Sequence, residues 1–511
     1  MKTTLRLFRS AGVVSLGTIS SRVLGFLREI LMAWTFGTDK VASAFVVAFT
    51  IPNLFRRLFG EGALSAAFIP SYVRVREEKG QLSAWQLTRN TASLLILILG
   101  GISFAGMLLC TLALRVETLP DTLAAILGSL RILLPYMIWI CLAALLMGVL
   151  NSHRRYVFPA FIPCVLNACW IGTLIYVNHR ADLDDDLKIE ILCWVILFAG
   201  FLQFALQLPA VWKLGYRGPE KVDPLGPEVK KVLTLMGPAA LGAAVFQVNV
   251  LCDRLLALWV GGYGPVSLAY AERLIYLPLG IFATALGTIL LPEFSTLVQL
   301  KDREQLGFML DRSLRVLMYV MIPASAGLAV LAAPIVEVSF QRGAFDALST
   351  LYTSRALTFY APGLIVFSTA KIFIPLYYAH GDTRTPVRIG LWTVLANLLL
   401  NLLFILVLPD GWKHAGLALG TVLSSLLQVI LLAGICQKRY AQLHWGPVLL
   451  SWARCGLACV PMILAARGAL YWTGSLELIL RVPLAIVAAG GVYGLVTLLL
   501  RCPEIRELRR N

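Results

Sequence analysis

Charged residues inside apolar stretches are the residues of this sequence most able to do chemistry. Arg22 and Arg28 lie six residues apart in the first such stretch, about 9 Å along a helix, and Glu29 follows directly. A charge at the centre of a bilayer costs about 2.5–3.5 kcal/mol on insertion scales, so these side chains are expected to face a wet cavity, a partner or the interface. The other charges of this kind are Arg56, Arg57, Asp253, Arg254, Glu272, Arg273 and Lys371.

Cations outnumber acids at these positions, which favours an anionic ligand. A guanidinium group makes bidentate hydrogen bonds to phosphate, so a cavity lined by arginine suits a phosphorylated ligand. Other interpretations stay open. The adjacent pairs Asp253-Arg254 and Glu272-Arg273 can be structural ion pairs between helices, and Arg56, Arg57 and Lys371 can extend to the membrane interface.

The first apolar stretch sets the directions of its two arginines. On a regular helix Arg22 and Arg28 project about 120° apart, so one narrow stripe would not hold both. A break at Gly25 would bring the two side chains to one cavity, and we treat this as a hypothesis.

The composition identifies the elements that position these charges. The chain has 511 residues, 59% hydrophobic and 14% charged, with a mean hydropathy of +0.79. A soluble domain is about 45–50% apolar and about 25% charged. We predict an all-α polytopic membrane protein with about 14 transmembrane helices, because apolar runs of about 20 residues recur and do not alternate as barrel strands do. The runs are 11–36, 41–59, 92–114, 130–150, 158–177, 189–208, 232–260, 267–291, 316–333, 360–378, 389–408, 415–436, 448–466 and 478–500.

The basic residues indicate topology. The net charge is +16, and most of the 44 Lys and Arg fall in the segments that are cytoplasmic if the N-terminus is cytoplasmic. This is the positive-inside pattern, so we predict a multi-pass bacterial inner-membrane protein with both termini in the cytoplasm. We expect no nucleic-acid partner. Ser20, Ser21 and Arg22 interrupt the first apolar run and no small-x-small cleavage site follows, so we expect a retained helix rather than a signal peptide.

A weak internal repeat recurs at about 225 residues. Segment 28–37 resembles segment 253–262, and three landmark pairs keep the spacing: Pro52 and Pro278, Pro70 and Pro292, His153 and His380. We predict an N-lobe at 1–225, a C-lobe at 226–440 and a terminal helix pair with a basic tail at 441–511. Six helices per lobe make the lobes parallel repeats, related by a pseudo-two-fold axis along the membrane normal.

The sequence carries none of the common catalytic or metal-binding motifs. We find no Gly-x-x-x-x-Gly-Lys-Ser/Thr, His-Glu-x-x-His, Gly-x-Ser-x-Gly or Cys-x-x-Cys. We therefore predict no catalytic residue, no metal and no cofactor. Uphill transport would be coupled to the membrane potential, an ion gradient or the flux of substrate.

At these same residues the chain resembles the MurJ (MviN) family of lipid II flippases, in the multidrug/oligosaccharidyl-lipid/polysaccharide (MOP) exporter superfamily. The resemblance spans essentially the whole chain. Its most specific motif is Ser21-Arg22-Val23-Leu24-Gly25-Phe26-Leu27-Arg28-Glu29, and further motifs lie at 51–65, 270–274, 286–292 and 382–387. The resemblance implies that the protein flips lipid II, the undecaprenyl-diphosphate-linked peptidoglycan precursor, from the cytoplasmic to the periplasmic leaflet by alternating access.

The resemblance also implies a substrate site and partners. We predict substrate binding by Arg22, Arg28, Arg56, Arg57, Arg273, Ser21, Glu61 and Glu272, with Arg254, Lys371 and Ser43 as further candidates. Ser43 stands where family members commonly carry an acid, and Tyr276 where some relatives carry another, so acid-dependent gating at these positions is not expected. The terminal helix pair would form a groove for the lipid tail. Expected partners are lipid II, membrane phospholipids and proteins of peptidoglycan synthesis.

Four alternatives remain at this stage. One is flipping of another polyprenyl-diphosphate-linked glycan. A second is export of an amphipathic drug. A drug exporter would favour acids and aromatic residues in its cavity, whereas the charges in the apolar stretches of this chain are mainly basic. An intramembrane enzyme acting on polyprenyl phosphates would need clustered acids or histidines at the membrane edge, whereas the 28 Asp and Glu lie mostly in loops. A scaffold would have no need for arginines at lipid depth.

Overall fold

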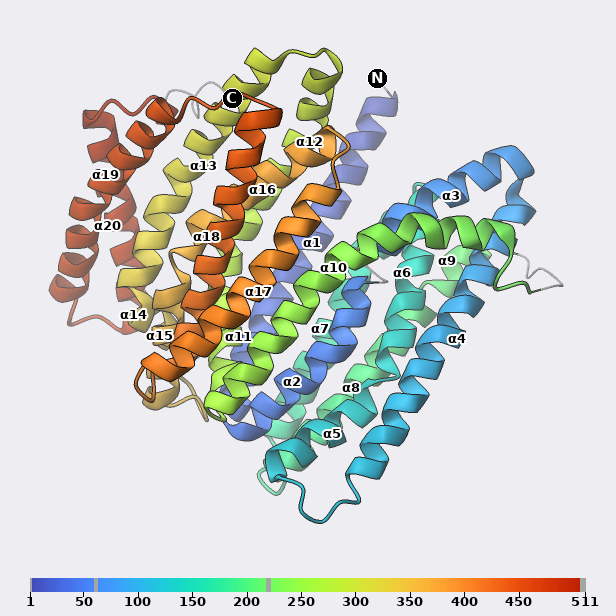
Figure 1. Cartoon of the computed structure of the whole chain (residues 1–511). Coiled ribbons are helices and arrows are strands. Elements are labelled where there is room, and N and C mark those ends of the chain that lie inside the picture. Colours follow the sequence, from blue (N-terminus) through green and yellow to red (C-terminus); the bar gives the residue numbers. More distant parts are fainter. Residues whose placement is uncertain (1, 59–62, 217–221, 506–511) are drawn as a thin grey trace. The chain divides into compact units, whose positions relative to one another are not determined.

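The computed structural model describes residues 2–58, 63–216 and 222–505, and every regular element in these ranges is a helix (Figure 1). The chain divides into two compact units, Met1–Leu251 and Cys252–Asn511. The first unit holds α1 (Lys2–Phe36), α2 (Lys40–Phe55), α3 (Ala63–Lys79), α4 (Gln81–Ala113), α5 (Asp121–Leu133), α6 (Tyr136–Ser152), α7 (Val157–Asn178), α8 (Asp185–Ala205), α9 (Leu208–Trp212) and most of α10 (Pro227–Val260).

The second unit begins within α10 and contains the remaining helices. They are α11 (Gly264–Pro278), the π-helix η2 (Leu279–Ala283), α12 (Thr284–Gln299), α13 (Arg303–Val330), α14 (Ala332–Phe340), α15 (Ala347–Tyr360), α16 (Gly363–Ala379), α17 (Arg384–Val407), α18 (Lys413–Arg439), α19 (Trp445–Trp472) and α20 (Leu478–Leu499). The predicted boundaries at 225 and 440 stay predictions.

The apolar helices agree with the predicted spans. Within the described ranges, 11 helical segments are long and apolar enough to cross a membrane, or 12 if the bent pair α15 and α16 counts as one span. The two other predicted spans coincide with α1 and α10, which are helical over 35 and 34 residues. The prediction of an all-α polytopic membrane protein is confirmed.

The two units share one internal order of helices. In each, a helix with a proline near its end runs into a π-helical turn: Pro52 of α2 before residues 56–58, and Pro278 of α11 before η2. In each, a span is broken before a second proline, at Pro135 between α5 and α6 and at Pro362 between α15 and α16. The packing partners also correspond, since α2 packs on α5 as α11 packs on α15, and α6 on α8 as α16 on α18.

The helix α1 is continuous, which corrects the hypothesis of a break at Gly25. Its closest neighbour is α7. A Cβ at Gly17 would lie 2.6 Å from the carbonyl oxygen of Ala160, so glycine at this position lets the two backbones approach closely. Arg22 and Arg28 therefore keep the different directions of a regular helix.

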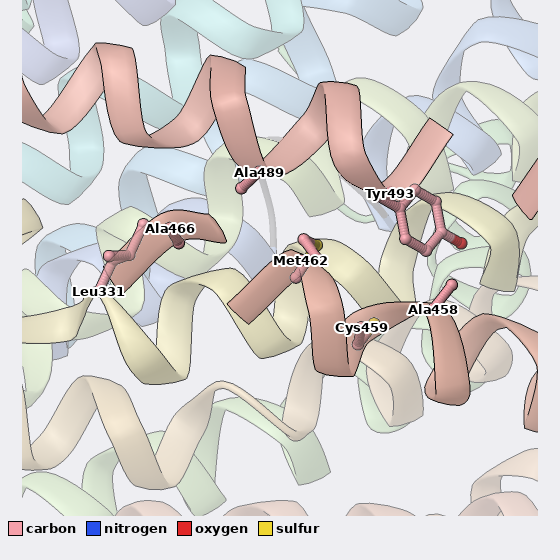
Figure 2. Packing of buried hydrophobic residues seen from close by; sticks show 7 residues of the cluster. All are labelled: Leu331, Ala458, Cys459, Met462, Ala466, Ala489 and Tyr493. Carbon is pink, nitrogen blue, oxygen red and sulfur yellow. The ribbon is translucent and has the colours of Figure 1, made fainter. Parts of the chain in front are cut away.

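The terminal helices α19 and α20 pack on each other and on α13 and α14. Figure 2 shows the buried cluster between them, in which Met462 and Cys459 of α19 meet Tyr493 and Ala489 of α20. The Tyr493 hydroxyl donates to the Tyr319 carbonyl oxygen of α13 at 2.8 Å. This contact ties the terminal pair to the body of the second unit.

Candidate functional site

Arg28 is the charged residue of α1 with the most described contacts. Its Nη2 donates to Glu29 Oε1 at 2.5 Å, and its Nη1 donates to Asn167 Oδ1 of α7 at 3.1 Å. Its guanidinium carbon lies 4.4 Å from the ring centroid of Trp170. The Arg28 side chain is 13% exposed, and its Nε is buried without a hydrogen-bond partner among the described residues. The Arg28 guanidinium group is thus held in place, and its Nε–H donor is still available for a hydrogen bond.

Asn167 acts as a brace between α7 and α1. Besides accepting from Arg28, its Nδ2 donates to the carbonyl oxygen of Ser21 at 3.1 Å. The amide spans almost two turns of α1, from Ser21 to Arg28. Gly25 lies between these contacts, and a Cβ there would be 3.8 Å from Asn167 Nδ2. A methyl group there would be in ordinary van der Waals contact with the amide.

Two phenylalanine rings also contact Trp170. Its ring meets Phe45 and Phe49 of α2 edge-on, with ring centroids 5.5 and 5.4 Å apart. The two phenylalanine rings stack on each other at 5.9 Å. Three helices of the first unit therefore converge where Arg28 is held, and the aromatic contacts fix the indole plane over which the guanidinium lies.

Arg22 differs from Arg28 in its surroundings. Its side chain is exposed, and it makes no hydrogen bond or ion pair within the described part of the chain. An exposed guanidinium group can offer its five N–H donors to a ligand without first breaking a hydrogen bond or ion pair within the protein. Ser21 contributes its backbone carbonyl to the Asn167 brace, and the predicted role of its side chain stays a prediction.

The end of α2 holds the next predicted pair. Arg56 is half-buried, caps α2, and donates from Nε to Asn53 Oδ1 at 2.8 Å. Arg57 is half-buried in the following π-helical turn. Glu61 lies outside the described residues. Ser43 is fully buried in α2, and its hydroxyl has no hydrogen-bond partner among the residues described.

In the second unit, Arg254 forms an ion pair inside the protein. Its Nη2 lies 2.6 Å from Glu272 Oε2 of α11, and its Nη1 donates to the Pro265 carbonyl oxygen at 2.9 Å. The Tyr360 hydroxyl donates to the other carboxylate oxygen of Glu272 at 3.1 Å. Arg254 is 6% exposed. The pair therefore links α10, α11 and α15, which fits the structural alternative for these charges.

Asp253 faces a different set of partners from Arg254. Asn401 Nδ2 of α17 donates to its Oδ1 at 2.6 Å, and the Thr421 hydroxyl of α18 donates to its Oδ2 at 3.3 Å. Asn401 also donates to Asn397 Oδ1, one turn earlier on α17, at 3.0 Å. These four side chains form one polar network, here named the Asp253 network, and it ties the end of α10 to α17 and α18.

The two remaining predicted cations of the second unit are exposed. Arg273 of α11 follows Glu272 in the chain and is exposed. Lys371 is exposed on α16, at the point where α16 passes close to Gly287 of α12. The structure thus brings Arg254 and Glu272 together, and Arg28 together with Ser21 through Asn167.

Several residues of these assemblies were missed by the sequence reasoning: Asn167, Trp170, Tyr360, Asn397, Asn401 and Thr421. The asparagines carried a usable signal, because an amide inside an apolar span needs a hydrogen-bond partner. Asn397 and Asn401 also lie four residues apart, on one face of a helix. The aromatic and hydroxyl partners had no such signal.

Residues 32–482 match the sequence model of the family described as lipid II flippase MurJ. The chain belongs to the lipid II flippase MurJ family. Relatives include the probable lipid II flippase MurJ of Rickettsia prowazekii, 33% identical over 445 residues, covering 86% of this chain and 85% of that protein. The lipid II flippase MurJ of Burkholderia cenocepacia is 32% identical over 480 residues, covering 92% and 90%.

Solved structures show the same fold. A lipid II flippase MurJ in an inward closed conformation superposes with a TM-score of 0.78 at 23% identity, covering 96% of this chain and 98% of that one. An inward-facing multidrug resistance transporter of the MATE family and MOP superfamily has a TM-score of 0.68 at 12% identity, covering 82% and 94%. The resemblance to the MurJ family is confirmed, and the family is one of multi-pass membrane transporters.

Proposed function

We propose that the protein flips lipid II from the cytoplasmic to the periplasmic leaflet by alternating access. The observation that carries this proposal is the MurJ family match over residues 32–482, which includes Asn167 and Trp170, the residues that hold Arg28. A transporter of a diphosphate-linked lipid needs cations at membrane depth, and α1 supplies two of them. This chain covers 85% and 90% of the length of the two relatives named above.

Arg22 and Arg28 have different roles in this proposal. Arg22 is exposed, so it is the first cation that the diphosphate contacts. Arg28 is oriented by Asn167 and Trp170 and partly neutralised by Glu29, so it adds a second, fixed set of donors once the phosphate competes with that carboxylate. A prearranged donor loses little freedom on binding, which favours affinity.

The remaining predicted residues enter as separate proposals. Arg56, Arg57 and Glu61 would bind substrate from the end of α2 and the segment after it. Arg273 would contribute from the second unit, and Lys371 is a further candidate there. Arg254 and Glu272 already satisfy each other, so we assign this pair to holding the helices of the second unit in place.

The source of energy is proposed on electrostatic grounds. An inside-negative potential opposes inward movement of an anion and favours the inward return of an empty cationic carrier. One elementary charge crossing 100 mV is worth about 2.3 kcal/mol, so the potential is large enough to bias the cycle. Both termini are proposed to be cytoplasmic, on the distribution of Lys and Arg. Proteins of peptidoglycan synthesis are the proposed protein partners.

A binding and transport assay tests the proposal. The purified full chain is reconstituted in proteoliposomes with fluorescent lipid II, and translocation is followed by quenching of the exposed lipid. We expect transport by the wild-type protein and a loss of at least about tenfold in Arg22→Ala, since a charge-assisted hydrogen bond contributes about 1.5–3 kcal/mol. Arg180→Ala is the control, because Arg180 is paired with Asp182 in an exposed loop. Transport of another polyprenyl-diphosphate glycan in place of lipid II would contradict the substrate assignment.

A further inference from the structure

One carboxylate in the first unit holds three cations at the start of α10. Glu228 Oε2 accepts from Arg74 Nη2 at 3.1 Å, and Glu228 Oε1 accepts from Lys79 Nζ at 2.7 Å and from Lys231 Nζ at 3.4 Å. The Glu228 side chain is 19% exposed, whereas those of Arg74, Lys79 and Lys231 are 40%, 51% and 55% exposed. The cluster, here named the Glu228 cluster, therefore presents unneutralised positive charge at its outer side.

An apolar crevice begins one residue away from this carboxylate. Val229, Val232, Leu233 and Met236 form its α10 wall, and their spacing places them on one face of the helix. The other wall is the part of α4 from Thr91 to Leu99. The crevice has a volume of about 40 Å³. The three helices that surround it, α3, α4 and α10, can be followed in Figure 1.

The crevice opens beside exposed apolar side chains of α4 and α10. α4 is one of the apolar membrane-spanning segments, and Ile98 of its crevice wall is 40% exposed, next to the more exposed Leu97. On α10, Leu235 is also exposed beside the crevice. The lone polar lining side chain is Thr91, whose hydroxyl has no hydrogen-bond partner within the described residues. A water there would lack the two to four polar partners it requires, so a hydrocarbon chain is the better occupant.

We propose that this end of the first unit binds one anionic phospholipid, with its phosphate on the Glu228 cluster and part of an acyl chain against the crevice between α4 and α10. The charges support an anionic rather than a zwitterionic lipid, because three exposed cations surround one acid and Lys230 adds a fourth. Glu77 and Glu78 are also exposed on α3. To bind these two carboxylates, the amine of a zwitterionic headgroup would have to compete with the positive charges of the Glu228 cluster. This inference does not depend on the proposed transport of lipid II.

Native mass spectrometry of the purified full chain tests the proposal in the absence of lipid II. Phosphatidylglycerol and phosphatidylethanolamine are titrated separately, and retained lipids are counted. We expect one phosphatidylglycerol to bind with preference to wild type, and its apparent affinity to fall about tenfold or more in the double variant Lys79→Gln/Lys231→Gln. Arg74 still pairs with Glu228 in that variant, so the contact between α3 and α10 is retained.

A second variant separates the acyl chain from the headgroup. Val232→Phe fills the crevice and leaves the cations unchanged, and it should also lose the preferred lipid. The matched control is Arg155→Gln/Lys213→Gln, which removes two exposed cations outside the cluster and should bind phosphatidylglycerol like wild type. Equal retention of both lipids by wild type, unchanged binding in Lys79→Gln/Lys231→Gln, or an equal loss in the control would overturn the proposal. Unchanged binding in Val232→Phe would overturn the crevice as the place of the acyl chain.

Discussion

The guanidinium group of Arg28 lies over the indole ring of Trp170, with 4.4 Å between Arg28 Cζ and the ring centroid. Asn167, on the same helix as Trp170, accepts a hydrogen bond from Arg28 Nη1. A cation over an aromatic ring gains about 0.5–2 kcal/mol, most where water is excluded. The two contacts from α7 fix both the plane and the direction of the arginine. The Arg28 side chain is therefore already oriented before an anion binds.

Removing the brace should uncouple Arg28 from α7. In Asn167→Leu, Arg28 Nη1 and the Ser21 carbonyl lose their partner, and a buried polar group left unpaired costs about 1–3 kcal/mol. We expect a lower thermal unfolding temperature and weaker binding of lipid II, both measured on purified protein. Thr173→Val is the control on α7, because the Thr173 hydroxyl donates to the Cys169 carbonyl of its own helix. A variant with wild-type stability and binding would show that the brace has no role.

The Asp253 network should be sensitive to a methyl group that adds no charge. A Cβ at Gly420 would collide with Asn401 Oδ1, which now lies against α18. We expect Gly420→Ala to displace Asn401 from Asp253 and to destabilise the second unit by about 1–3 kcal/mol. Gly434→Ala on the same helix meets no atom within 4 Å and should be neutral or slightly stabilising. Equal unfolding temperatures for the two variants would contradict the network.

The Glu228 cluster should make the attachment of α10 to α3 depend on pH. The hydrogen bond from Lys79, assisted by Lys231, lowers the pKa of Glu228 below its ordinary value of 4.5. A carboxyl group with a lowered pKa in the folded state stabilises fully above the unfolded pKa and loses this contribution as the pH falls through the folded value. We expect the unfolding temperatures of wild type and Glu228→Gln to differ at pH 7 and to converge as the pH falls below 4.5 and through the lowered pKa of the folded state. A constant difference across this range would exclude Glu228 as the titrating group.

The proposed electrical coupling predicts a voltage-dependent rate. In proteoliposomes with a potassium diffusion potential, lipid II transport should change as the potential is varied, with a limit of about 2.3 kcal/mol per charge per 100 mV. Arg22→Ala removes a mobile charge and should reduce the dependence where residual transport is measurable. A rate that does not change with potential would rule out this coupling and leave an ion gradient or substrate flux as the energy source.

The helices could be predicted from sequence because their signal is local. Runs of about 20 apolar residues are visible one at a time. The repeat landmarks were visible for the same reason, and Pro52 and Pro278 both precede π-helical turns. The break at Gly25 was wrong, since glycine in a helix costs only about 1 kcal/mol and packing against α7 exceeds this.

The partners of the charges could not be predicted, because they are far apart in the chain. Arg28 and Asn167 are separated by 139 residues, and Asp253 and Asn401 by 148. Sequence spacing alone pairs a charge with its neighbours, which led to Asp253-Arg254 and Glu272-Arg273 as candidate pairs. The helices instead place Arg254 opposite Glu272 and Asp253 opposite Asn401, a choice that depends on how α10 packs against α11 and α17.

Complementation of a bacterial strain depleted of its lipid II flippase tests the central claim most directly. Wild type, Arg22→Ala, Arg28→Ala and the control Arg180→Ala are expressed at matched levels in the membrane. We predict that wild type and Arg180→Ala restore growth and that Arg22→Ala and Arg28→Ala do not, because the diphosphate loses its cations on α1. Growth with all four proteins would contradict the arginine site, and failure of well-expressed wild type would contradict lipid II as the substrate.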